Sequence, residues 1–451
     1  MTARLNNLVL PLAQKATAMR ITDTADSNQE RSGAVSMLIG NSLRQGDVDS
    51  KTIQSGLGIR TSTMVTRTTI TRATTIAAPA LSADHYNSFT FPQLVQAYLD
   101  CRKRKRNTES ALEFEQNLER NLVNLFDELK AGTYTPGKSI CFVITRPKPR
   151  EVWAAEFRDR IVHHLFYNAI APRFYATFIA DSCACIPGRG TLYAAQRLEK
   201  KIRSATQNWS QPCFYLKCDL ANFFVAIDKN ILHTQLAKRI DEPWWLSLAK
   251  VILFHDPRQN YELRGDPAKL ALVPEHKRLA LQSGNCGLPI GNLSSQFFAN
   301  IYLNELDQFI KHRIGAKHYI RYVDDFVLLH ESSKWLNQAL QQINEFLPQQ
   351  LHAKLNPRKT LLQPVSRGVD FVGQVMKPWH RHTRKRTVNT ALARLKQTNS
   401  HDQFVVGNSY LGLMGQSTAS HHNKTRVAKI MMQHGFTVKS DMSKVFRKTR
   451  P

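Results

Sequence analysis

The sequence has no long apolar run, no cysteine pair with metal-binding spacing and few acidic residues. Without about 18 consecutive apolar residues, a membrane-spanning helix is not expected. The seven cysteines include no C-x-x-C pair, so no structural zinc is predicted and a reducing compartment is favoured. Only 35 Asp and Glu face 62 Lys and Arg, a formal net charge of +27. Because such an excess repels itself, nucleic acid is the favoured partner, the alternative being scattered, solvated charge.

Composition divides the chain into four parts, with boundaries expected at 1–85, 86–205, 206–376 and 377–451. The first part is rich in Thr, Ser, Ala, Asn and Gln, so we expect a poorly ordered or partner-dependent extension. It has no acid before Asp23, which would suit a transit peptide, although a flexible tail is favoured. The second and third parts alternate helical and strand patterns, and the last is basic and helical. Together they predict an α+β protein.

Apolar spacing predicts the principal elements. Helical spacing runs through 94–129 and is interrupted by RKRKR at 102–106, which is either a solvated face or a contact to RNA. The remaining expectations are strands at 140–144, 214–220 and 369–376, helices at 161–174, 292–310 and 410–451, and a hairpin at 318–330.

Acidic residues at strand ends carry the strongest chemical signal. In HYIRYVDDFVLLH, Asp324 and Asp325 lie between two strand-prone arms, and in FYLKCDLANFFVAID a strand ends at Asp219. The adjacent pair alone could be a polar turn. Asp228 lies further along its segment and is interpreted as structural. Carboxylates that converge repel one another unless a cation joins them.

Nucleotidyl transfer offers a reason for three such carboxylates. The reaction needs a 3′-hydroxyl activated and a pyrophosphate stabilised, and two Mg²⁺ ions about 3.5–4 Å apart supply both effects. Mg²⁺ prefers hard carboxylate oxygens and phosphate oxygens. We therefore expect Asp219, Asp324 and Asp325 to hold two Mg²⁺, with Mn²⁺ as a substitute.

These motifs resemble the reverse transcriptase family, in its bacterial branch. The order matches: Asp219 with Phe223 and Phe224, then GLPIGNLSSQFFANIYLNELD, YVDD, LNPRKT and FVG, over roughly residues 90 to 376. The resemblance implies an α+β right-hand polymerase architecture. The fingers would lie within 86–205, a palm with a ferredoxin-like antiparallel sheet within 206–376, and a helical thumb within 377–451.

The resemblance also implies residue roles in the reaction. Phe224 would exclude a ribose 2′-hydroxyl, and Lys359 would protonate the leaving pyrophosphate. Lys148 and Arg150 would grip the triphosphate of the incoming dNTP. Contacts to the template RNA and the RNA–cDNA duplex are expected from Arg158, Arg160, Arg189, Arg381, Arg384, Lys385 and Arg386.

One departure from the common family pattern points to a subgroup. Many members have Gln-Gly and Ser-Pro where this chain has Ile290, Gly291, Ser295 and Gln296. Those residues, expected in the dNTP pocket, resemble the error-prone enzymes of diversity-generating retroelements, which misincorporate opposite template adenine. Such systems imply a bacterial or phage origin, a cytoplasmic location and a small helical accessory protein or oligomer as partner. The alternatives are an antiphage-defence reverse transcriptase, a splicing cofactor that retains the fold, and a viral RNA-copying polymerase.

Overall fold

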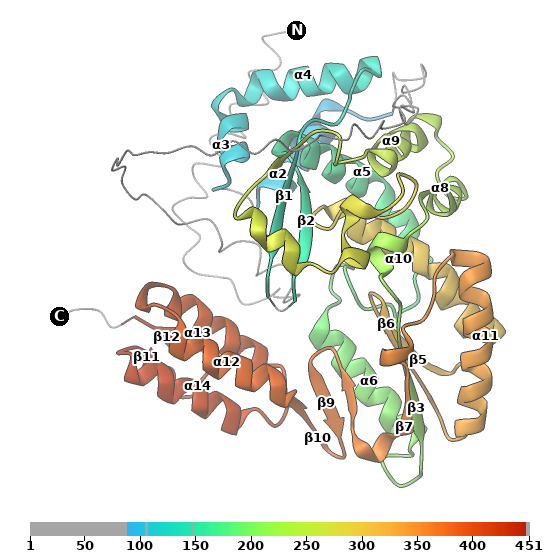
Figure 1. The fold of residues 1–451 in the computed structure, drawn as a ribbon, viewed down its shortest axis with the longest axis vertical. Helices are drawn as coiled ribbons and strands as arrows, with labels where there is room; N and C mark the ends of the chain where they lie inside the picture. The colour runs from blue at the N-terminus through green and yellow to red at the C-terminus, as the bar shows by residue number, and fades with distance from the viewer. Residues whose placement is uncertain (1–87, 104–106, 147, 448–451) are drawn as a thin grey trace, which may run out of the picture.

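The computed structural model describes residues 88–103, 107–146 and 148–447. The predicted extension at 1–85 and positions 104–106 of the basic run lie outside these residues. The described part is a mixed α+β structure, as predicted, with its longest helices above and beside one antiparallel sheet (Figure 1). None of the helices in this described part is long and apolar enough to cross a membrane.

Helices form the upper layer of the molecule (Figure 1). Phe89 packs on Trp244, with ring centroids 4.9 Å apart, and so fastens the start of the described chain to a later helix. Helix α5 is apolar on most sides, as a buried helix must be, and packs against α2 and α10. The helices of this layer are α2 (Phe91–Arg102), α3 (Glu109–Gln116), α4 (Leu118–Ala131), α5 (Phe157–Tyr175), α8 (Lys229–Ala237), α9 (Pro243–Phe254) and α10 (Leu293–Gln308).

The central sheet has the strand order β5-β6-β3-β7, and every neighbouring pair is antiparallel. Alternate side chains enter two separate cores because strand residues point to opposite faces in turn. Leu216 and Leu328 join the large helical core, whereas Tyr215 and Val327 pack with the smaller core that α6 covers. The strands are β3 (Phe214–Asp219), β5 (His318–Tyr322), β6 (Asp325–His330) and β7 (Leu361–Pro364), with α6 (Thr191–Ala205) and α11 (Ser333–Leu351) packed against them.

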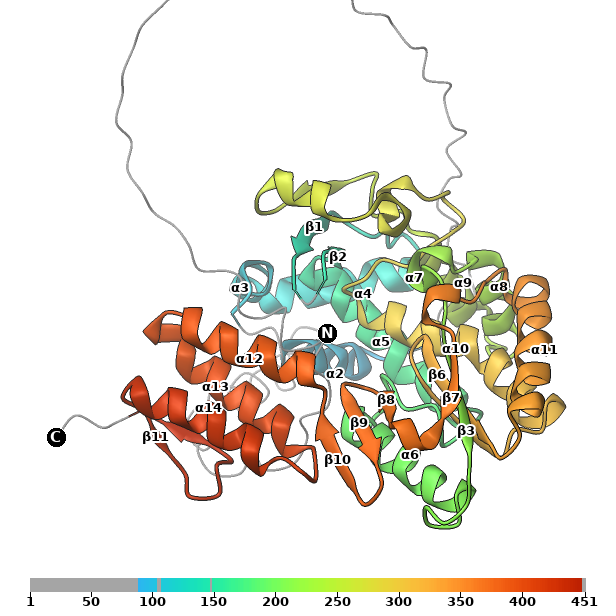
Figure 2. The same cartoon turned by 60° about the horizontal axis from the view of Figure 1, so that its bottom comes forward.

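A second sheet, of order β2-β1-β4, lies beside the helical layer. The hairpin of β1 (Ser139–Ile144) and β2 (Arg150–Ala155) continues into the body through a backbone bond from Trp153 N–H to the Ile290 carbonyl, at 2.7 Å. Strand β4 (Tyr261–Leu263) precedes three 3₁₀ helices, at Pro267–Leu272, Glu275–Lys277 and Leu279–Leu281. These turns cover the hairpin in Figure 2, and no sequence pattern predicted that association.

The C-terminal part corrects two predictions. The single strand expected at 369–376 is a hairpin, because Val372 and Gly373 take positive φ angles of 44° and 82° and reverse the chain. The ending is not wholly helical, because a short strand pair follows Gly435, whose φ of 82° ends the last helix. The elements are β8 (Val369–Phe371), β9 (Gln374–Lys377), β10 (His380–Thr383), α12 (Lys385–Gln397), α13 (Ser400–Gly415), α14 (His421–Gln433), β11 (Thr437–Val438) and β12 (Val445–Phe446).

A buried hydroxyl on α10 offers a test of this packing. Tyr302 is fully buried and donates its hydroxyl to the carbonyl of Leu351, at 2.6 Å. Tyr302→Phe leaves that carbonyl without its donor, so we expect the free energy of unfolding to fall by about 1–3 kcal/mol. Denaturant titration measures the loss, and Tyr261→Phe, on an exposed ring, serves as the control. Equal stability of the two variants would contradict the prediction.

Candidate active site

The register of β3 against β6 brings the sequence-predicted acids together. Asp219, the last residue of β3, is paired directly with Asp325, the first residue of β6. The next backbone contact joins Leu220 N–H to the carbonyl of Asp324, at 3.3 Å. Carboxylates from two distant parts of the sequence, Asp219 and the adjacent pair Asp324 and Asp325, therefore lie at one end of the central sheet.

Burial and crowding change the acidity of Asp324 and Asp325. Burial raises the pKa of Asp324, and the nearby Asp219 carboxylate adds to the effect. Burial also raises the pKa of Asp325 to about 7; Asp324 and Asp219 add to this shift, and Lys217 opposes it. Both shifts have the direction expected when like charges share a poorly solvated place. The cluster therefore favours the arrival of a cation or a proton.

Lys359 already supplies one positive charge. Its ammonium group donates to both Asp219 carboxylate oxygens, at 2.5 and 2.6 Å. The 3₁₀ turn Pro357–Lys359 reaches this place because Asn356 N–H donates to the Asp219 carbonyl and the Asn356 side chain caps the turn. The lysine side chain is half-exposed, so one side of it faces solvent.

The expected nucleotide-pocket residues lie on α7 and on the segment that leads into α10. Phe224 belongs to the one-turn helix α7 (Phe223–Ala226), is half-buried, and accepts at its carbonyl from Leu288 N–H. Ile290 accepts from β2, and Gly291 follows with a φ of 134°. Gln296 is exposed on the first turn of α10.

Positive charges gather near the β1–β2 turn. Lys148 and Arg150 are both exposed there. Although its side chain is exposed, loss of some hydrating water lowers the pKa of Lys148, and the charges of Lys359, Lys277, Arg150 and Arg386 lower it further. Lys277 was missed by sequence reasoning, because it lies in the 3₁₀ segment that carries no motif. Its position follows from Leu279 N–H, which donates to Glu151 on β2.

Of the basic residues expected to bind nucleic acid, most are paired within the protein and two are exposed. Arg381 is a correction: it is buried, pairs with Glu199 at 2.8 Å and donates to the Gln416 carbonyl, so it does not reach phosphate. Arg160 and Arg189 donate to backbone carbonyls, and Arg158 pairs with Glu128. Arg384 pairs with Asp370, whereas Lys385 and Arg386 are exposed at the start of α12.

Residues 146–376, just over half of the chain, match the family described as "Reverse transcriptase (RNA-dependent DNA polymerase)". The chain belongs to the reverse transcriptase family. It is therefore an RNA-directed DNA polymerase by family. The resemblance stated from the motifs is confirmed at that level.

Two relatives place this reverse transcriptase more widely. Over 298 residues it is 23% identical to Protein YkfC of Escherichia coli strain K12, covering 58% of this chain and 71% of YkfC. Among solved structures it resembles apo telomerase from Candida tropicalis truncated from the C-terminal domain, at 13% identity and a TM-score of 0.40. That match covers 53% of each chain, so this reverse transcriptase spans about half of the telomerase chain, and no conclusion rests on it.

Close packing at Gly291 generates a prediction for this reverse transcriptase. A Cβ there would lie 2.9 Å from Val152 Cγ1 and 3.2 Å from the Trp153 carbonyl oxygen. Gly291→Ala should therefore push β2 away from the strand ends and reduce primer extension. Gly315→Ala is the matched control, because Gly315 also has a positive φ, of 74°, but no atom within 4 Å of its Cβ position. Equal activity of the two variants would show that the close contact does not matter.

Proposed function

We propose that this reverse transcriptase copies RNA into DNA at the end of the central sheet, with Asp219, Asp324 and Asp325 as the ligands of two Mg²⁺ ions. The observation that carries the proposal is the pairing of Asp219 with Asp325 in the β3–β6 ladder. If Asp324 and Asp325 formed only a polar turn, no third acid on another strand would be needed. A site for divalent cations does, because carboxylates that repel one another are stabilised together only by positive charge.

The residues fit a divalent cation in kind. All three donors are hard carboxylate oxygens, the class that Mg²⁺ prefers. The Lys359 ammonium on Asp219 marks a place where positive charge is already stabilised. Among the residues that the structure describes, no three acidic, His or Cys groups are arranged to surround one ion as they stand. Metal binding therefore requires Lys359 to leave Asp219 and the carboxylates to turn towards a common point.

When bound, the metal ions would activate the primer 3′-hydroxyl and offset charge on the triphosphate. The protein's own groups would do the rest. Lys148 and Arg150 would hold the triphosphate, Phe224 would leave no room for a 2′-hydroxyl, and Lys359 would give a proton to pyrophosphate. The exchange of partners by Lys359 links the two tasks, because the lysine released from Asp219 becomes available to the leaving group.

The proposal also includes a right-hand polymerase arrangement of three subdomains. In this proposal 86–205 supplies the fingers, 206–376 the palm, and 377–451 the thumb, where Lys385 and Arg386 contact the RNA–cDNA duplex. Within the family, Ile290 favours an error-prone retroelement enzyme, because no amide is present there to hydrogen-bond the base pair. Its partners would be template RNA, dNTPs and a small helical accessory protein.

Replacement of one acid tests the metal site. Asp325→Asn keeps the shape of the side chain but removes its charge. The rate of primer extension should therefore fall at least about 100-fold, as is typical when a group that stabilises charge in the transition state is removed. Asp228→Asn is the control, because Asp228 caps α8 and an asparagine caps equally well. Extension by Asp325→Asn at the wild-type rate would refute the site.

Fidelity tests the retroelement proposal. Ile290→Gln restores an amide beside the nucleotide pocket, so we expect fewer misincorporations opposite template adenine and unchanged errors opposite the other bases. Ile290→Leu keeps the apolar character and should leave the error spectrum as it is. Sequencing of cDNA made from one defined RNA compares the three proteins. An unaltered adenine error rate in Ile290→Gln would rule out this mechanism of infidelity.

The antiphage-defence alternative shares the same catalytic residues. The surrounding DNA separates the two: a near-duplicate pair of repeats that differ at adenines supports the retroelement, and a gene without such repeats supports defence. The absence of any primer extension would indicate a splicing cofactor. A preference for NTPs over dNTPs would indicate a viral RNA-copying polymerase.

A further inference from the structure

The two residues on either side of Tyr322 are held in unusual ways. Val323 has a φ of 56°, a left-handed conformation that β-branched residues rarely adopt. Such a conformation persists only where surrounding contacts impose it. Val323 directly precedes Asp324 and Asp325, so the contacts that impose its conformation also decide where the two carboxylates point.

Arg321 supplies those contacts from a fully buried position. Its side chain is 1% exposed, and that of its ion-pair partner Asp307, on α10, is 0% exposed. Nε and Nη2 donate to the two Asp307 oxygens at 2.7 and 2.6 Å, which is a bidentate clamp. The Tyr319 hydroxyl donates to the same carboxylate at 2.6 Å. The clamp therefore fixes the plane of the guanidinium against a helix.

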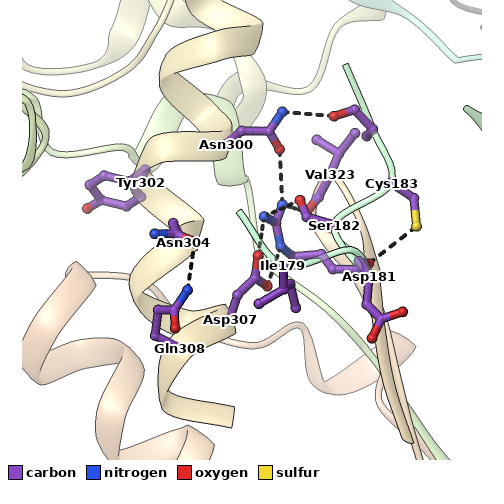
Figure 3. A network of polar contacts seen from close by, with 12 residues as sticks. Ile179, Asp181, Ser182, Cys183, Asn300, Tyr302, Asn304, Asp307, Gln308 and Val323 are labelled. Carbon is purple, nitrogen blue, oxygen red and sulfur yellow. Dashed lines mark hydrogen bonds and ion pairs between the residues drawn. The ribbon is translucent and has the colours of Figure 1, made fainter. Parts of the chain in front are cut away.

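The rest of the guanidinium donates to the turn and to a neighbouring loop. Figure 3 labels the residues that accept these bonds, among them Val323, Asn300 and Ser182. Nη1 donates to the Val323 carbonyl at 3.0 Å and to Asn300 Oδ1 at 3.3 Å. Nη2 also donates to Ser182 Oγ at 2.9 Å. With the Asp307 bonds, these contacts use all five N–H donors that an arginine has.

The loop that faces the guanidinium is fixed by the same residue. Arg321 N–H donates to the Asp181 carbonyl, and Cys183 N–H donates to the Arg321 carbonyl, both at 2.9 Å. Asn300 in turn donates to the Ala184 carbonyl at 2.8 Å. One residue thus connects α10, the 181–184 loop and the turn at Val323.

We propose that Arg321 is a positioning residue for catalysis: its guanidinium, aligned by Asp307, holds the Val323 carbonyl and so sets the geometry of Asp324 and Asp325. The inference rests on the proposed function of those aspartates. A lysine could retain the charge next to Asp307, but it has three donors on a single nitrogen and no planar fork. Three donors cannot replace the five bonds that the guanidinium makes to Asp307, Ser182, Asn300 and the Val323 carbonyl.

The test compares Arg321→Lys with wild type in primer extension. Misplaced ligands lower the chemical rate without weakening the grip on substrate, so kcat should fall roughly 10- to 100-fold while the KM for dNTP stays within about twofold. The Mg²⁺ concentration for half-maximal rate should rise, because the carboxylates no longer meet the ions together. A role in folding alone would leave both the half-maximal Mg²⁺ and the kcat per folded molecule unchanged.

Arg258→Lys is the matched control, because Arg258 also clamps an aspartate, Asp256, at 2.7 Å through Nε and Nη2 and donates to a backbone carbonyl. Its kcat and Mg²⁺ requirement should stay at wild-type values. If Arg321→Lys does not fold, Ser182→Ala removes a single acceptor and should give the same change, smaller in size. Wild-type kcat and Mg²⁺ requirement in a folded Arg321→Lys or Ser182→Ala would overturn the inference. Absence of extension by the wild-type enzyme would instead count against the proposed function.

Discussion

The structure depends on one constraint, the antiparallel register of β3 and β6. Pairing of Asp219 with Asp325 places like charges side by side at a strand end, where burial raises the pKa values of Asp324 and Asp325. A shift of one residue would turn the apolar faces of the strands away from their two cores. Burial of residues such as Leu216 and Val327 therefore sets the register of the strands and, with it, the close approach of the carboxylates at the sheet end. The hydrophobic effect stabilises this arrangement against the repulsion.

The surroundings of the acids offset this repulsion in stages. Lys359 contacts Asp219 directly, and Lys148, Arg150, Lys277 and Arg386 lie near enough to one another to lower the pKa of Lys148. Each group is electrostatically unfavourable by itself, since the acids repel one another and so do the cations. A bound polyanion with its metal ions would satisfy both, which is why a nucleoside triphosphate suits this place better than a simple anion or a simple cation.

The sequence predicted the parts of the site that lie in local patterns. Strand ends and the Asp-Asp turn predicted acids that the β3–β6 register brings together, whereas the roles given to those acids, to Phe224 and to Lys359 stay predictions. The sequence did not predict that Val369–Lys377 is a hairpin, because Val372 adopts a positive φ that its side chain disfavours. Nor did it indicate Lys277, which depends on a contact between Leu279 and Glu151, 128 positions apart in the chain.

Charge was the least reliable sequence signal, because a total of +27 does not say which cations face outward. Arg381 was expected at phosphate but pairs with Glu199 inside the protein. Arg321 was missed for the opposite reason: no motif of its own distinguishes it from the acid pair that follows. In the structure all five of its N–H donors are bonded. The bonds to all five of its N–H donors offset the cost of burying its charge. Its five acceptor atoms come from three separate segments of the chain, so only the fold reveals that a satisfied cation lies next to the acid pair.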